Sequence, residues 1–212
     1  MTRFFSTFAL MAMATTATSE SFSADVWADN WFEMRIDGVQ VAEDSVPITT
    51  ERSFNAESLT FEAERPFTIG LVAKDFKEND TGLEYIGSRR QQMGDGGVIV
   101  QIFDESGHVA AVSGDNWQCY VIHTAPLDKS CEASRNPVAG QGACGFNAED
   151  APVDWDAPTF DASGWPAADV YSEREVGPKD GYDRISWVED AQLIWGPDLE
   201  QSHTVLCRLT VK

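Results

Sequence analysis

Two cysteines and two histidines occur at the same spacing in two segments that are rich in β-forming residues. In the first segment His123 follows Cys119 by four positions, and in the second Cys207 follows His203 by four positions. Side chains alternate between the two faces of a strand, so each cysteine shares a face with its histidine. If the segments pair antiparallel with Cys119 opposite Cys207, the same register places His123 opposite His203.

Opposed imidazoles on paired strands offer two nitrogen ligands to one ion. His108 or Met34 could add a third ligand, and such a set suits copper or zinc. Against this hypothesis, the chain has three histidines in 212 residues, and scattered histidines are most often hydrogen-bonded surface groups. The sequence thus leaves copper or zinc at His123 and His203 as one open hypothesis.

Calcium is a less favoured cofactor. Residues 78–80 and the carboxylates of Asp154, Asp156 and Asp161 supply oxygen ligands of the kind that calcium takes. No calcium motif of fixed spacing is present, and clusters of Asp and Asn are typical of ordinary turns. We therefore expect turns at these positions.

The four cysteines favour disulfides, for which three connectivities are possible. Cys131 and Cys144 bracket a loop rich in glycine and proline, where a local bridge is physically sensible. That bridge would leave Cys119 to pair with Cys207. A zinc site of four thiolates is the alternative, but no C-x-x-C pair exists and the spacing is irregular.

The N-terminus has the composition of an export signal. Arg3 precedes an apolar and small-residue run from Phe4 to Thr18, and a cleavage site is available near Ser19. The run is short and diluted by Ser and Thr, which disfavours a membrane anchor, and no other stretch is apolar enough to span. We expect a signal peptide over residues 1–19 and one domain over residues 20–212, located in the periplasm or outside the cell.

The charge of the chain excludes some partners. The formal net charge is −20 and the pI is near 4.3, whereas phosphate binding needs concentrated Lys and Arg. We expect no nucleic-acid partner and no membrane insertion after signal cleavage. The simplest reason for the charge is solubility.

The apolar pattern predicts an all-β protein. Sixteen glycines and nine prolines separate many short apolar runs, and no sustained helical period is present. Residues 32–36 alternate and lead into Asp37-Gly38, which is a two-residue hairpin signal. Residues 67–73 are apolar on both faces, as in a central strand, and residues 75–97 form a long polar loop.

The sequence contains no motif that indicates catalysis. The chain has no G-x-S-x-G sequence and no metalloprotease helix, and its thiols are better explained as disulfides. Pairs such as Glu149-Asp150 arise by chance in a chain with 35 acidic residues. We therefore expect no enzyme activity.

Several stretches occur in an order that is typical of a known family: residues 28–41, 67–73, 96–100, 115–117, 160–165, 193–195 and 205–208. Their order resembles the galactose-binding-like jelly-roll modules that occur beside rhamnosidase and related glycosidase domains. The resemblance implies a sandwich of two antiparallel sheets that binds rather than catalyses, although such a fold hosts many functions. The loop from Cys119 to Cys144 departs from the family pattern.

Carbohydrate or a cell-surface glycan is the ligand that this resemblance and the aromatic content favour. Asp29, Asn30, Trp31 and Tyr85 are the candidate ligand-binding residues, because exposed aromatic rings beside polar loop residues suit sugar stacking. Trp155 and Trp187 have similar settings, whereas Trp117, Trp165 and Trp195 lie in apolar patterns and are expected in the core. The prediction is an exported, non-catalytic carbohydrate-binding module. The alternatives are a copper- or zinc-binding protein and a structural envelope component.

Overall fold

The computed structural model describes residues 18–212. The predicted signal peptide, residues 1–19, therefore lies almost entirely outside the described residues. No helix in the described part of the chain is long and apolar enough to cross a membrane.

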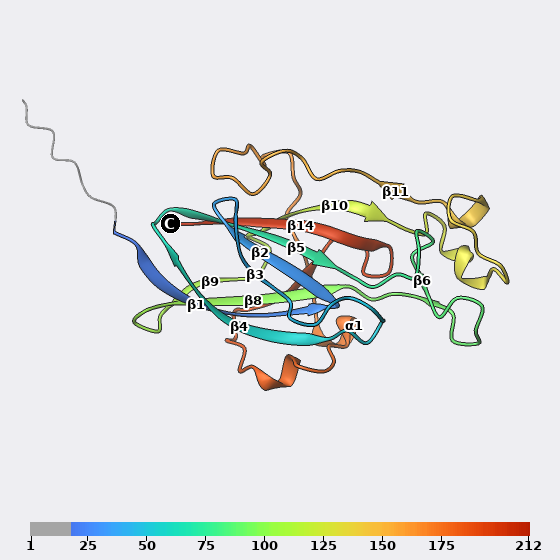
Figure 1. The fold of residues 1–212 in the computed structure, drawn as a ribbon, viewed down its shortest axis with the longest axis horizontal. Helices are drawn as coiled ribbons and strands as arrows, with labels where there is room; N and C mark the ends of the chain where they lie inside the picture. Colours follow the sequence, from blue (N-terminus) through green and yellow to red (C-terminus); the bar gives the residue numbers. More distant parts are fainter. Residues whose placement is uncertain (1–17) are drawn as a thin grey trace, which may run out of the picture.

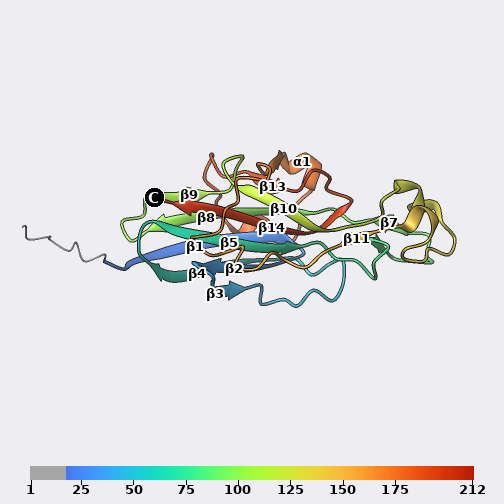
Figure 2. The ribbon, with the colours of Figure 1, turned by 90° about the horizontal axis from the view of Figure 1, so that it is seen from above.

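Two antiparallel sheets pack face to face, which confirms the predicted all-β sandwich (Figures 1 and 2). Sheet A has the order β12 (Asp169–Tyr171), β13 (Leu193–Trp195), β8 (Gly97–Asp104), β1 (Glu20–Asp29) and β4 (Asn55–Ala63), and β9 (Val109–Val112) also pairs with β8. Sheet B has the order β11 (Asn147–Ala148), β10 (Gln118–Thr124), β14 (Ser202–Val211), β5 (Phe67–Lys74), β2 (Trp31–Ile36) and β3 (Val39–Glu43). The specific likeness to galactose-binding modules stays a prediction.

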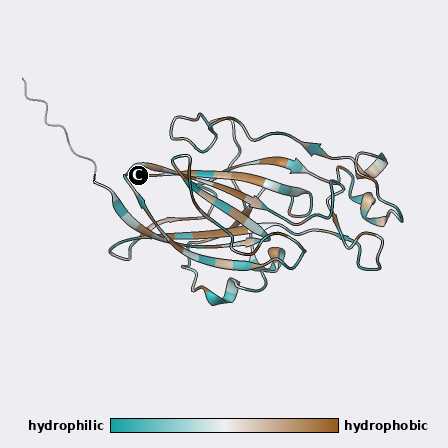
Figure 3. Ribbon diagram, in the orientation of Figure 1, coloured by the Kyte–Doolittle hydropathy of each residue, from teal (hydrophilic) through white to brown (hydrophobic). Residues whose placement is uncertain are grey.

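The sandwich core comes from side chains that alternate along these strands. In β2, Phe32, Met34 and Ile36 are buried between the sheets, while Glu33 and Arg35 face outward. Figure 3 shows the same contrast across the molecule, with hydrophobic residues concentrated in the strands and hydrophilic residues in the loops. The fold thus follows from period-two patterning, as the sequence indicates.

The hairpin between β2 and β3 is also confirmed. Both Asp37 and Gly38 have positive φ, at 49° and 82°. Such a turn matches the twist of the two flanking strands, and Asp and Gly tolerate its backbone conformation.

The burial of the tryptophan side chains agrees only in part with the prediction. Trp117 and Trp195 are fully buried in the core, as predicted. Trp165 is only half-buried, and it stacks on Tyr120 on the outer side of sheet B. The prediction that Trp165 lies in the core was therefore wrong. Trp155, in a loop, is only 6% exposed.

Both predicted disulfides are present. Cys119 lies directly opposite Cys207 on β10 and β14, and Cys131 bridges to Cys144. The histidines do not share that register, because an irregularity between Val121 and His123 places His123 opposite Thr204. A β-bulge of this kind advances one strand relative to the other.

Loops gather at one end of the sandwich, opposite the C-terminus (Figures 1 and 2). This end contains the small sheet of β6 (Leu83–Glu84) and β7 (Gln92–Met93) and the 3₁₀ helices η1 (Lys129–Ala133) and η2 (Gly142–Cys144). The Cys131–Cys144 bridge packs with Leu83 in a small hydrophobic cluster. The remaining short elements are helix α1 (Glu173–Val176) and η3 (Tyr182–Arg184).

Candidate functional site

Three buried carboxyl groups lie at the loop end of the sandwich. Asp29 ends β1, Asp75 follows β5 and Glu84 lies in β6, and each residue is at most 3% exposed. We call Asp29, Asp75 and Glu84 the acidic cluster. Asp95, which precedes β8, lies at its rim with a side chain that is 40% exposed.

The acidic cluster is short of hydrogen-bond donors. Among the described residues, neither carboxylate oxygen of Asp29 has a hydrogen-bond partner, while Oδ2 of Asp75 lies 2.9 Å from Nδ1 of His203. Glu84 accepts one bond, from Nε2 of Gln92 at 2.9 Å. Buried polar groups in folded proteins are usually paired, so a buried carboxyl group without a hydrogen bond, as at Asp29, is unusual.

Lys179 brings a positive charge to this cluster. Its Nζ lies 3.0 Å from Oδ2 of Asp95 and 3.8 Å from Oδ2 of Asp29. One ammonium cannot balance three buried carboxylates and Asp95 at once. The cluster must therefore hold protons or a further cation.

The pKa values reflect this imbalance. Burial raises the pKa of Asp29 and of Asp75 well above the usual range, and the neighbouring charge of Asp95 adds to both effects. Burial, followed by repulsion from Asp75, raises the pKa of Glu84 to about 8. The charges of Asp75 and Glu84 also raise the pKa of Asp29, because like charges nearby disfavour the ionised form.

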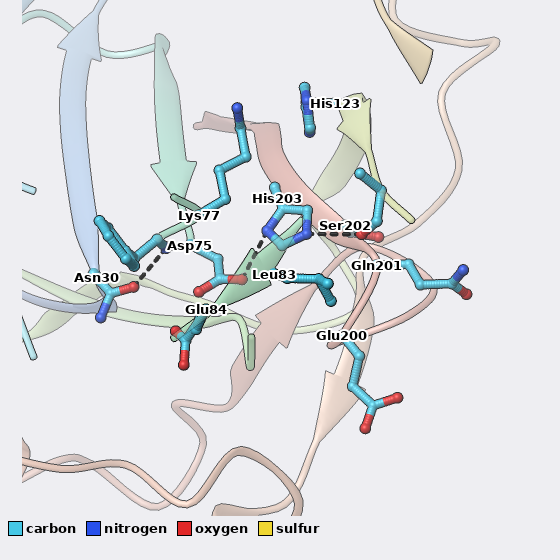
Figure 4. Close-up of polar contacts among 12 residues, drawn as sticks. Asn30, Asp75, Lys77, Leu83, Glu84, His123, Glu200, Gln201, Ser202 and His203 are labelled. Atoms are coloured by element: carbon cyan, nitrogen blue, oxygen red, sulfur yellow. Dashed lines mark hydrogen bonds and ion pairs between the residues drawn. The ribbon is translucent and has the colours of Figure 1, made fainter. Parts of the chain in front are cut away.

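Two residues next to the acidic cluster, Asn30 and Gly94, fix the chain around it. Asn30 accepts a bond from the Phe76 amide at 2.6 Å and donates to the Glu51 carbonyl at 3.1 Å, which ties the end of β1 to the loop after β5 (Figure 4). Gly94 lies against the carboxyl group of Asp75, and a Cβ added at Gly94 would overlap Oδ2. The loop before β8 therefore needs glycine at this position.

His203 contacts the acidic cluster from β14. Its Nε2 donates to the Ala125 carbonyl at 2.8 Å, and its Nδ1 lies 2.9 Å from Oδ2 of Asp75 (Figure 4). The ring is fully buried, and burial lowers the pKa of His203 to about 4. Both nitrogens face oxygens, so a neutral ring that donates through Nε2 can only accept at Nδ1. The contact with Asp75 then requires a proton on that carboxyl group, in agreement with its raised pKa.

His123 meets His203 edge to face, with ring centroids 5.7 Å apart and planes at 71°. Its Nε2 lies 3.1 Å from Oδ1 of Asp80, and its Nδ1 is buried without a hydrogen-bond partner among residues 18–212. Burial lowers the pKa of His123 to about 4, and the charge of Lys77 adds to the effect. The structure thus brings the two predicted histidines together, but their nitrogens contact different partners.

The other predicted metal ligands lie elsewhere. His108 is 82% exposed beside Asp104 in the turn between β8 and β9, and Met34 is buried in the core. Within residues 18–212, no three His, Cys, Asp or Glu side chains are arranged to hold a metal ion as they stand.

Three of the carboxylates considered for calcium are engaged in ion pairs or hydrogen bonds with protein groups. Asp80 pairs with Lys77 at 2.6 Å, Asp156 pairs with Arg35 at 3.3 Å, and Asp161 accepts a bond from the Ser163 amide. These contacts agree with the expectation of turns at these positions.

A second candidate site is an open groove of about 700 Å³ on the outer face of sheet B. Val72, Ile122 and Leu206 supply its apolar part, and Trp155 supplies an indole. Charged side chains complete the lining, namely those of Glu33, Arg35, Lys74, Asp154 and Asp156.

The loop that carries Trp155 is tightly attached to the sheet. Trp155 lies over Gly70, where an added Cβ would come within 3.2 Å of the indole. Arg208 on β14 donates to the carbonyls of Phe160 and Ala157, at 2.8 and 3.0 Å. The wall of the groove is therefore built into the fold.

The predicted ligand-binding residues fall into two groups. Trp31 shares the outward face of β2 with Glu33, and Nζ of Lys74 lies 4.4 Å from the centre of its ring, so Trp31 lies beside the groove. Asp29 and Asn30 are buried at 1% exposure. Tyr85 is half-buried with the Arg90 guanidinium 3.9 Å over its ring.

Sequence reasoning missed Asp75, Glu84 and Lys179. The signal that could have found two of them is an acidic residue next to an apolar run, as in Val72-Ala73-Lys74-Asp75 and Leu83-Glu84. In a chain with so many carboxylates this signal is weak.

The fold and these sites define a two-sheet antiparallel β-sandwich with two disulfides and a buried acidic cluster at its loop end. Comparisons with protein-family models, with curated proteins and with solved structures find no match for this chain.

Proposed function

We propose that the chain is an exported, non-catalytic binding module whose ligand is a carbohydrate or a cell-surface glycan. The observation that carries the proposal is the groove on the outer face of sheet B, which combines apolar side chains, an indole and charged groups. Ligand sites usually combine an apolar lining with a few polar groups that set orientation.

The chemistry of sugars suits this lining. A sugar ring has apolar C–H faces that pack on aromatic and aliphatic side chains, and hydroxyl groups that bond to carboxylates and ammonium groups. Lys74 is available for the second task, because it lines the groove and its Nζ lies over the Trp31 ring. Trp31 and Lys74 are therefore the residues that we assign to ligand contact.

Export is part of the same proposal. Disulfides persist in the periplasm and outside the cell, and both cysteine pairs of this chain are bridged. The strongly acidic composition argues against nucleic acid as a partner.

A glycan array followed by titration calorimetry with the best ligand tests the proposal. Trp31→Ala is expected to weaken binding roughly tenfold, because the indole stacks on the sugar. Trp187→Ala is the matched control, since Trp187 is also half-buried but packs against Tyr182 on the other side of the molecule. Thermal unfolding of both variants separates lost contact from lost fold.

An array without any bound glycan would overturn the carbohydrate proposal, as would equal losses in the two variants. Elemental analysis of the purified protein tests the copper or zinc alternative at the same time. That alternative is favoured by the unpartnered Nδ1 of His123 and opposed by the contacts of His203. It requires stoichiometric metal that His123→Ala removes.

A further inference from the structure

The floor of the groove on sheet B contains a line of residues that crosses four strands. β2, β5, β14 and β10 are consecutive neighbours in this sheet (Figure 1). In their register Trp31 lies opposite Lys74, and Lys74 lies opposite Thr204. Thr204 pairs in turn with His123, which Ile122 precedes on β10. We call Trp31, Lys74, Thr204 and Ile122 the cross-strand row.

The cross-strand row is accessible along its length. Each of its four residues is only half-buried. Lys74, Thr204 and Ile122 line the groove, and Trp31 lies beside it under Nζ of Lys74. Neighbouring strands lie about 4.8 Å apart, so the three spacings between four strands give a row about 14 Å long. A row of this length is longer than a single sugar ring needs.

The wall of the groove runs parallel to the cross-strand row. Gly70 lies under the side chains of Trp155 and Asp156. In the register its partners are Arg35 on β2 and Arg208 on β14. Arg35 pairs with Asp156, and Arg208 bonds to two carbonyls of the same loop. The loop is therefore anchored on three neighbouring strands, and the groove between this loop and the row runs across the strands.

The charges that line the groove are of both signs. Arg35 lies in ion pairs with Glu33 and Asp156. Lys74 and Asp154 add one charge of each sign to the lining. The formal net charge of the whole chain is −20, which repels polyanions. A neutral ligand with many hydroxyl groups suits this lining, because a hydroxyl group donates to carboxylates and accepts from ammonium groups.

We infer that the groove binds a neutral, linear chain of sugar units that lies along the cross-strand row. The inference rests on the proposed carbohydrate function and adds the form of the ligand. A sugar unit in an extended chain advances by about one strand spacing, so each of the four strands can contact one unit. The chain packs on Trp31 at one end and on Ile122 at the other, and its hydroxyl groups bond to Lys74 and Thr204.

Titration calorimetry measures how affinity depends on the length of the chain. The probes are cello-, xylo- and manno-oligosaccharides, each from the monosaccharide to the hexasaccharide. In the series that binds, affinity is expected to rise roughly tenfold or more from the monosaccharide to the tetrasaccharide, because each added unit contacts a further strand. Affinity then levels off, since longer chains extend beyond the row. Oligogalacturonates of the same lengths are expected to bind more weakly, because the acidic protein repels their carboxylates.

Two variants test the part of the row that lies away from Trp31. Ile122→Ala is expected to weaken binding of the tetrasaccharide roughly tenfold through lost apolar contact. Thr204→Val keeps the shape of the side chain and removes its hydroxyl group, and it is expected to weaken the same binding roughly fivefold. Both variants should leave binding of the disaccharide, which needs only Trp31 and Lys74, unchanged.

Val153→Ala is the matched control for Ile122→Ala, since Val153 is 85% exposed and does not line the groove. Thermal unfolding shows whether each variant folds, and Thr204→Val carries the test if Ile122→Ala does not.

The results separate this inference from the proposed function. Equal affinity for the monosaccharide and the tetrasaccharide would overturn the assignment of a chain and leave carbohydrate binding in place. Full affinity of both folded variants for the tetrasaccharide would do the same, as would array binding limited to branched glycans. Tighter binding of oligogalacturonates would overturn the assignment of a neutral ligand. Absence of binding in the array and in every series would overturn both proposals.

Discussion

At the scale of single residues, the loop end depends on close contacts with the acidic cluster. Asn30 ties two chain segments together, Gly94 packs on Asp75, and His203 contacts Asp75 and Ala125. The sequence singled out Asn30 and His203, but for ligand binding and not for these contacts, and it gave no signal at Gly94. Their roles come from neighbours that are distant in the chain.

Gly94→Ala tests the closest of these contacts. The added methyl group would overlap Oδ2 of Asp75, and overpacking a filled site typically costs about 1–3 kcal/mol of unfolding free energy. Urea unfolding measures the loss. Gly164→Ala is the control, because a Cβ at Gly164 meets no atom within 4 Å and this glycine has no positive φ. Equal stability of the two variants would show that Asp75 does not depend on this close approach.

At the scale of elements, β10 and β14 were predicted as neighbours from their cysteines, and that pairing is confirmed. The same reasoning placed His123 opposite His203, and this register was wrong by one residue. Residue alternation gives no sign of the irregularity after Val121, since a bulge depends on how both strands twist. The imidazole rings of His123 and His203 nevertheless contact each other.

The two disulfides are expected to stabilise the fold unequally. Cys119–Cys207 closes a separation of 88 residues and Cys131–Cys144 one of 13 residues. In the chain-entropy model, the longer loop corresponds to about 4–5 kcal/mol of unfolding free energy and the shorter to about 3 kcal/mol.

Urea unfolding of the two double alanine variants, one for each bridge, measures these contributions. Removal of Cys119–Cys207 should cost more, both because its loop is longer and because its sulfurs lie in the core. Wild-type protein with reductant is the control for effects of the substitutions themselves. A larger loss on removing Cys131–Cys144 would contradict this ranking.

At the scale of the whole molecule, stability should depend on pH in a direction set by the acidic cluster. Asp29, Asp75 and Glu84 have raised pKa values, so the folded state holds protons that the unfolded chain releases. Their favourable contribution is complete below the unfolded pKa and is lost as the pH rises, for Glu84 through about 8. Asp95 and Lys179 at the rim affect the size of the change but not its direction.

His123 and His203 act in the opposite sense. Their folded pKa values of about 4 lie below the unfolded value, so their contribution is present above the unfolded pKa and is lost as the pH falls toward about 4. Above about pH 7.5 the histidines are largely neutral in both states, since their unperturbed pKa is about 6.5. The acidic cluster should therefore determine the slope above this pH.

We therefore predict that the free energy of unfolding falls as the pH rises from about 7.5 to 8.5. The slope is on the order of 1.4 kcal/mol per pH unit for each cluster proton retained by the folded state. Urea unfolding at several pH values measures it, and Glu84→Gln should reduce the slope by one such contribution. A flat profile, or an unchanged slope in Glu84→Gln, would show that Glu84 is already ionised.

Features that depend on local pattern and on counting could be predicted from the sequence. Alternation in residues 32–36 and the Asp37-Gly38 turn indicate a strand and a hairpin, because burial on one face of a strand imposes a period of two. The apolar run of residues 67–73 indicates a central strand that is covered on both faces. The four cysteines leave few pairings, and the one with a short local loop is correct. These features need only neighbours in the chain or a short list of partners.

Contacts between residues that are far apart in the chain could be read only from the tertiary structure. Asp29, Asp75 and Glu84 come from three segments separated by loops, and a single carboxyl group carries no sign that it will be buried beside two others. Trp165 was assigned to the core, yet it lies on the outer side of sheet B because its loop is held there by Arg208. Burial and charge coupling are properties of the packed chain, and they arise only when the two sheets and their loops close around the same space.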